Sequence, residues 1–168
     1  MPVRFIYGIK VSGYRYNLEL IREALALMKE KTPEFFRLVK ENVKEIREKD
    51  SEVFSLMRSP LTLARALKDR IIFPPYWAIF FDKYAIASFI IHETYHIKEG
   101  KKGLPHTKDS EIRARQAQIA FLKTLAKMEG ANFEKEIKSL EEEIDSIRKG
   151  TFYSDLPWES ELSAPGIE

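Results

Sequence analysis

Residues 82–98 of the chain read DKYAIASFIIHETYHIK, and this stretch decides the fold that the sequence predicts. Asp82 is a residue type that caps helix N-termini, and the helix is expected to run from about Lys83 to Lys98 and to stop near Gly100. Most sides of this helix carry apolar residues of its own, namely Ile86, Ala87, Phe89, Ile90, Ile91 and Ile97. Because a helix that is apolar on most sides belongs inside a fold, we expect the rest of the chain to pack around it.

Three polar residues interrupt this apolar helix in the pattern His92-Glu93-Thr94-Tyr95-His96. Residues four apart share one face of a helix, so His92 and His96 can place two imidazole nitrogens on one metal ion. Glu93 lies about 60° around the helix from His96, where its carboxylate can reach a water bound to that ion. Burying such groups without partners costs on the order of several kcal/mol, which a metal ion would offset. The pattern predicts one Zn²⁺ bound by His92 and His96, with Glu93 as general base and acid.

The chain has no cysteine, so the third zinc ligand must be a histidine or a carboxylate. One common continuation places Gly and His three and six residues after the second histidine, but Glu99 and Lys102 occupy those positions. The other continuation is a glutamate on a following helix, and Glu111 fits it. The alternatives that remain are His106, Asp109 and Glu99, of which His106 is the main rival and Glu99 is expected to face solvent. Arg115, one turn beyond Glu111, is expected to be a solvated helix arginine, with orientation of Glu111 as the alternative.

With these motifs the chain resembles the gluzincin zinc metallopeptidases, whose hallmark is His-Glu-x-x-His with a downstream helical glutamate. The segment from Glu111 to Ala117 looks like their glutamate helix, and the chain's length is most similar to the minimal, single-domain members. The resemblance covers about Ile71 to Met128. It implies hydrolysis of peptide bonds through zinc-bound water, with a peptide or protein as substrate.

The resemblance also implies two further parts of a peptidase site. In gluzincins the strand before the motif helix commonly binds substrate as an added strand, and that place here is held by Trp77, Ala78, Ile79, Phe80 and Phe81. A Tyr or His donor often stabilises the oxyanion, and the candidates for that role are Tyr153, Tyr76 and His106. The alternative interpretation of the first segment is a plain core strand.

The remaining patterns predict an α+β fold that is predominantly helical, with a small sheet whose edge strand packs on the motif helix. A short strand with a turn at Gly13 is expected within Arg4 to Tyr16, followed by a helix capped by Asn17. A second helix begins at Pro33 and is lined by Phe35, Phe36, Val39, Val43 and Ile46. Further elements are a short helix from Leu61 to Leu67, a strand at Ile71 to Phe73, and helices from about Thr107 to Met128 and Asn132 to Lys149.

We expect one compact domain made of three parts. Residues 1–70 hold the N-terminal strand and helices, residues 71–150 hold the zinc-peptidase core with its C-terminal helix, and residues 151–168 form a tail. The 168 residues carry 28 basic and 26 acidic side chains, so no polycationic surface for nucleic acid is expected. No apolar run is long enough for a membrane span, and the first residues lack signal-peptide character. The expectation is a cytoplasmic protein without membrane or nucleic-acid partners, and a homodimer is left open.

The tail combines aromatic residues with Asp155, Glu159 and Glu161 and has no helical or strand period. One hypothesis is that it lies across the active site as a built-in inhibitor; the alternative is that it packs on the surface or joins a dimer. A second function class also stays open, a regulatory metal-binding protein that acts through protein–protein contacts. Glu93 favours the enzyme, because a purely structural zinc site does not need a glutamate at that point.

Overall fold

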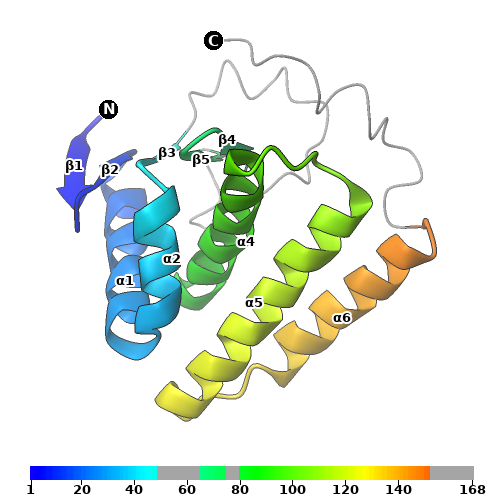
Figure 1. The fold of residues 1–168 in the computed structure, drawn as a ribbon. Coiled ribbons are helices and arrows are strands. Elements are labelled where there is room, and N and C mark those ends of the chain that lie inside the picture. Colours follow the sequence, from blue (N-terminus) through cyan, green and yellow to red (C-terminus); the bar gives the residue numbers. More distant parts are fainter. Residues whose placement is uncertain (49–64, 75–79, 152–168) are drawn as a thin grey trace.

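The computed structural model describes residues 1–48, 65–74 and 80–151, and these residues form five helices and one five-stranded sheet (Figure 1). The helices are α1 (Arg15–Lys31), α2 (Pro33–Asn42), α4 (Lys83–Lys101), α5 (Lys108–Glu129) and α6 (Glu134–Arg148). The strands are β1 (Val3–Ile6), β2 (Ile9–Ser12), β3 (Glu45–Glu48), β4 (Arg65–Leu67) and β5 (Arg70–Phe73). The predicted α+β class, predominantly helical, is confirmed.

The sheet has the order β1-β2-β3-β5-β4 and mixes parallel and antiparallel pairs. The three central strands β2, β3 and β5 run parallel, while β1 and β4 pair antiparallel at the two edges. Parallel neighbours need crossover connections, and α1 with α2 supplies the one between β2 and β3. The sheet edge that contacts α4 is β4, so an edge strand does pack on the motif helix.

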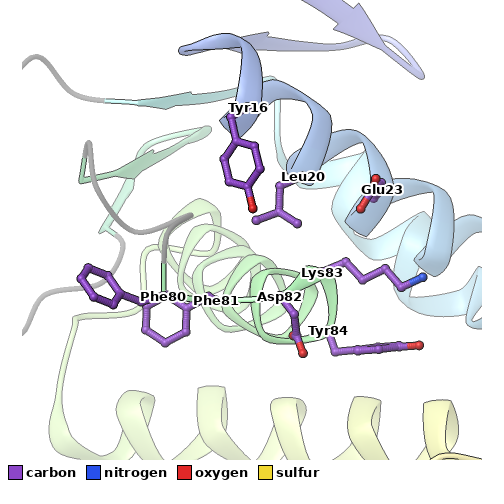
Figure 2. A pocket seen from close by; sticks show the side chains of 8 residues that line it. All are labelled: Tyr16, Leu20, Glu23, Phe80, Phe81, Asp82, Lys83 and Tyr84. Carbon is purple, nitrogen blue, oxygen red and sulfur yellow. The ribbon is translucent and has the colours of Figure 1, made fainter.

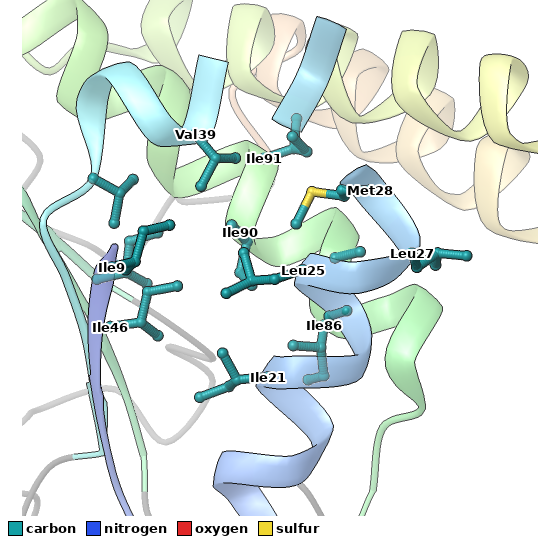
Figure 3. Packing of buried hydrophobic residues seen from close by; sticks show 14 of the residues in the cluster. Ile9, Ile21, Leu25, Leu27, Met28, Val39, Ile46, Ile86, Ile90 and Ile91 are labelled. Atoms are coloured by element: carbon teal, nitrogen blue, oxygen red, sulfur yellow. The ribbon is translucent and has the colours of Figure 1, made fainter. Parts of the chain in front are cut away.

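The core lies between the sheet and the helices α1 and α4 (Figure 3). Ile9 and Ile46 project from the strands toward Leu25 of α1 and Ile90 of α4, and all four side chains are buried. As predicted, α4 lies largely inside the fold; its buried residues are Ile86, Ala87, Ser88, Ile90, Ile91, Glu93, Thr94, Ile97 and Glu99. Asp82 caps α4 as predicted, because its side chain accepts a hydrogen bond from the Ala85 backbone N–H.

The N-terminal segment holds two strands where the prediction had one: the chain bends at Gly13 as predicted, and it also turns earlier, between β1 and β2. This earlier turn lies at Tyr7 and Gly8, both with positive φ, which suits the tight connection of the β1–β2 hairpin. Asn17 does not cap a helix: it is buried inside α1, and its side-chain amide donates to Glu48 at the end of β3. Glu48 itself accepts from the Tyr14 backbone N–H, so a carboxylate from the sheet satisfies the start of α1.

The second predicted helix begins at Pro33 as expected, but its predicted end is wrong, and so is part of the predicted helix from Leu61 to Leu67. The second helix ends at Asn42, and Ile46 lies in β3, where it pairs with Val11 on one side and Ile71 on the other. Residues 65–67 of the predicted helix from Leu61 to Leu67 form strand β4, while residues 61–64 lie outside the described residues. Neighbouring strands offer hydrogen bonds and burial that local helical spacing does not reveal.

The segment predicted as a substrate-binding strand is not a strand where the structure describes it. Phe80 lies in a turn and is 76% exposed, and Phe81 precedes α4 without regular structure, its ring packed edge-on against Phe89. Trp77, Ala78 and Ile79 lie outside the described residues. Within the described ranges, no helix is both long enough and apolar enough to cross a membrane.

Candidate metal centre

The candidate site lies where α4 and α5 run side by side in opposite directions (Figure 1). Thr107 begins α5 with a capping box, since its hydroxyl accepts from the Ser110 N–H while the Ser110 hydroxyl accepts from the Thr107 N–H. This cap fixes the start of α5 and places Glu111 in its first turn. Glu111 then faces the middle of α4, where His92 and His96 lie one turn apart.

His92, His96 and Glu111 bring one ligand atom each to within 4.8 Å of the others. The His92 and His96 Nε2 atoms are 3.1 Å apart, His92 Nε2 lies 3.4 Å from Glu111 Oε2, and His96 Nε2 lies 3.3 Å from Glu111 Oε1. Donors held tetrahedrally at zinc–ligand lengths of 2.0–2.1 Å stand about 3.3 Å apart. The three residues therefore have the chemistry and the spacing to hold one metal ion.

An outer hydrogen bond orients His92 toward this point. The Gln118 Nε2 donates to Ser88 Oγ at 2.9 Å, which turns the amide oxygen of Gln118 toward His92 Nδ1 at 2.8 Å. His92 Nδ1–H then donates to Gln118, and the Nε2 lone pair is left for a metal. Sequence reasoning missed Gln118, although it stands seven residues after Glu111 and so shares its face of α5.

Arg115 is not the solvated arginine that the sequence predicted. Its side chain is 8% exposed, and its Nη1 donates to Glu111 Oε2 at 2.5 Å and to the Glu111 carbonyl at 3.2 Å. Its Nε donates to Glu143 Oε2 of α6 at 2.7 Å. Arg115 therefore contacts the carboxylate of Glu111, in line with the alternative interpretation, and it also links α6 to this candidate ligand.

Of the three alternative candidates for the third ligand, only His106 lies at the site. His106 Nε2 lies 2.8 Å from Glu111 Oε1, and the His106 ring stands 4.6 Å from that of His96, so this loop histidine does fold back onto the site. Glu99 is buried rather than solvent-facing, because it pairs with Arg113 at 2.5 Å. Asp109 is exposed. Among the described residues, His92, His96 and Glu111 are the one group of His, Asp and Glu that meets the spacing of a metal site.

Glu93 lies beside the ligands on α4 and faces the sheet edge. It is buried, and the backbone N–H of Ala66 in β4 hydrogen-bonds to its carboxylate. Burial disfavours the charged carboxylate and raises the pKa of Glu93 above its ordinary value, although the nearby His92 and His96 oppose this shift. A carboxylate whose pKa is raised toward neutrality is suited to accepting and returning a proton.

The candidate ligands and His106 shift one another's pKa values. Burial disfavours the carboxylate of Glu111, but hydrogen bonds from His92 and His96 outweigh it and hold the pKa of Glu111 far below its usual range. Burial likewise opposes the charged form of His92, yet Glu111 and Glu93 raise its pKa. The pKa of His106 is lowered by burial and by the charge of His96. Glu111 is therefore a charged carboxylate that the histidines and Arg115 stabilise inside the fold.

Tyr76 and Tyr153, the other candidate oxyanion donors, lie outside the described residues. Elsewhere in the fold, an open pocket of about 540 Å³ is lined by residues of α1, of the segment before α4 and of the start of α4, including Tyr16, Phe80 and Tyr84 (Figure 2). His92 stands nine residues after the first residue of α4, about 13 Å along the helix, so this pocket is distinct from the metal centre.

Comparison with known proteins gives no relative: no family model, no curated protein and no solved structure matches this chain. The functional conclusion therefore rests on the site itself.

Proposed function

We propose that this protein is a zinc-dependent metallopeptidase of the gluzincin type, in which His92, His96 and Glu111 hold one Zn²⁺. The observation that carries the proposal is the convergence of three residues, with the two histidine Nε2 atoms 3.1 Å apart and each 3.3–3.4 Å from one oxygen of Glu111, and with the buried Glu93 beside them. A bound zinc ion supplies Lewis-acid polarisation of a carbonyl and lowers the pKa of water. A structural zinc site needs no such buried carboxylate next to its ligands.

Within this proposal Glu93 is the proton carrier. Its raised pKa lets the carboxylate take a proton from the attacking water and deliver it to the leaving amine. The hydrogen bond from the Ala66 N–H keeps the carboxylate oriented on the β4 side of α4. His106, whose ring lies against His96, is within the site and is our candidate to stabilise the oxyanion or to act as a further ligand.

The substrate is expected to bind along β4 rather than along residues 77–81. β4 is the outermost strand of the described sheet, contacts α4 and carries Ala66 next to Glu93. An extended peptide can add to such an edge through main-chain hydrogen bonds, which brings a peptide bond near the catalytic carboxylate. This arrangement favours endopeptidase action on unfolded or extended segments.

The decisive experiment compares the wild type with Glu93→Gln for zinc content and for cleavage of a mixed peptide library. We expect equal zinc in both proteins and a loss of cleavage in Glu93→Gln of at least about 100-fold, the lower range for a general base. Each protein is also prepared without residues 151–168. Higher activity of the shortened wild type would support the inhibitory tail, and unchanged activity of a folded, zinc-loaded shortened chain would contradict it.

The alternative function is a regulatory metal-binding protein without catalysis. The observation that favours it is the position of His106, whose Nε2 lies 2.8 Å from Glu111 Oε1. His106 is thus a fourth candidate ligand beside the three residues of the site. Equal zinc in both proteins with no cleavage by any form, full-length or shortened, would favour this second function.

A further inference from the structure

We propose that Arg115 makes Glu111 a metal ligand through one oxygen only, and that Glu143 of α6 holds Arg115 in place for this. The inference rests on the metal site proposed above and concerns how that site stays open to a substrate. It assigns a positioning role to Arg115 and gives the outermost helix α6 a part in the function of the centre.

The two oxygens of Glu111 have different surroundings. Oε1 lies 3.3 Å from His96 Nε2 and 2.8 Å from His106 Nε2, on the side of the histidines. Oε2 lies 3.4 Å from His92 Nε2 but accepts a charged hydrogen bond from Arg115 Nη1 at 2.5 Å. A guanidinium at this distance uses one lone pair of Oε2, and its positive charge repels a cation that approaches this oxygen. Oε1 is therefore the oxygen available to a metal.

Arg115 cannot easily leave this position. Its guanidinium is buried and keeps its charge at all relevant pH values, because an arginine does not deprotonate in proteins. Nη1 is further tied to the Glu111 carbonyl at 3.2 Å, and Nε is tied to Glu143 Oε2 at 2.7 Å. Two carboxylates on different helices thus hold one planar cation, and its orientation is set by both.

Binding through one oxygen of Glu111 sets the number of protein donors around the ion. Two histidines and one carboxylate oxygen are three protein donors, which leaves one position of a four-coordinate ion open, as catalytic zinc sites require. If Glu111 bound through both oxygens, its second oxygen would compete for that position. By keeping Oε2 of Glu111 away from the ion, Arg115 therefore leaves one coordination position open to water or substrate.

The test uses the full chain loaded with Co²⁺, whose visible absorption is strong in four-coordinate sites and weaker in five-coordinate ones. In Arg115→Met we expect weaker visible absorption than in the wild type, and one additional oxygen neighbour by X-ray absorption spectroscopy of the zinc form. Arg115→Lys keeps a cation but loses the planar fork that Glu143 holds, so its absorption should lie between those of the wild type and Arg115→Met. Glu142→Gln is the matched control, because Glu142 lies beside Glu143 on α6 but its side chain is 69% exposed.

A folded Arg115→Met protein with one Co²⁺ per chain and the wild-type spectrum would overturn the inference. If circular dichroism shows that Arg115→Met does not fold, Glu143→Gln decides, since Glu143 is 34% exposed and its loss should loosen Arg115 without unfolding the core. We expect its absorption between those of wild type and a five-coordinate site, and a spectrum equal to that of Glu142→Gln would overturn the inference. A wild-type chain that binds no Co²⁺ would contradict the metal site itself, a separate outcome from an unchanged spectrum.

Discussion

At the scale of single residues, the hydrogen bond between His92 and Gln118 decides which imidazole nitrogen faces the candidate metal site. Gln118 is 4% exposed and is itself oriented by Ser88. Replacing Gln118 with Leu should let the His92 ring rotate and change tautomer, and we expect the zinc dissociation constant to rise about 10- to 100-fold. Competition with a fluorescent zinc chelator measures this change. Gln116→Leu, an exposed position on the same helix, is the control, and equal dissociation constants for the two variants would contradict the orienting role.

The same residues show how far sequence reasoning reaches at this scale. His92, Glu93 and His96 are recognisable because their spacing within one helix fixes their relation. The roles of Arg115 and Gln118 depend on which face of α5 meets α4, so local patterns left two interpretations of Arg115 open and did not indicate Gln118. Once Glu111 is assumed to face α4, the positions four and seven residues later share its face, and this argument could have predicted both. Glu143 could not be found in that way, because it lies on another helix.

At the scale of elements, β3 is joined to the start of α1 through Glu48. This carboxylate is 2% exposed and accepts from the Tyr14 N–H at 3.0 Å and from Asn17 Nδ2 at 2.5 Å. Gly13 permits the approach, because a Cβ there would stand 3.0 Å from Glu48 Oε2. Glu48→Ala should leave two donors unpaired at a helix N-terminus and lower the free energy of unfolding by about 1–3 kcal/mol.

Urea unfolding followed by circular dichroism measures the effect of Glu48→Ala. Glu41→Ala on α2 is the control, since Glu41 is exposed, and its free energy of unfolding should change by less than about 0.5 kcal/mol. Equal stability of the two variants would show that α1 does not depend on the sheet for its cap.

Helices and strands also differ in how well the sequence predicts them, because local patterns do not reveal long-range contacts. The helices α4 and α5 have side-chain caps in the adjoining residues, and α4, α5 and α6 all agree with their predicted ranges to within about two or three residues. Strands β3 and β4 are short, at four and three residues, and exist because β5 lies between them. A prediction from local patterns had no access to that pairing, so it continued the preceding helix into β3 and placed a helix at β4.

At the scale of the whole molecule, the candidate centre adds to the packing and the polar contacts, such as Arg113 with Glu99, that already join α4 and α5. Its ligands come from α4 and α5, and Arg115 extends the connection to α6. A metal that binds the folded chain but not the unfolded chain stabilises the fold by about 2.7 kcal/mol at one hundred times its dissociation constant. For a chain of this length, we expect zinc to raise the melting temperature by about 5–10 °C.

Differential scanning calorimetry with and without a chelator tests this coupling, and two variants separate binding from catalysis. Glu93→Gln should keep the full zinc-dependent rise in melting temperature, because Glu93 is not among the ligand atoms. His96→Ala should lose most of it, because two remaining donors hold the ion far less tightly. If His96→Ala keeps the rise, the zinc that stabilises the protein binds elsewhere. If Glu93→Gln loses it, Glu93 contributes to holding the ion, and its assignment as a proton carrier beside the metal would have to be abandoned.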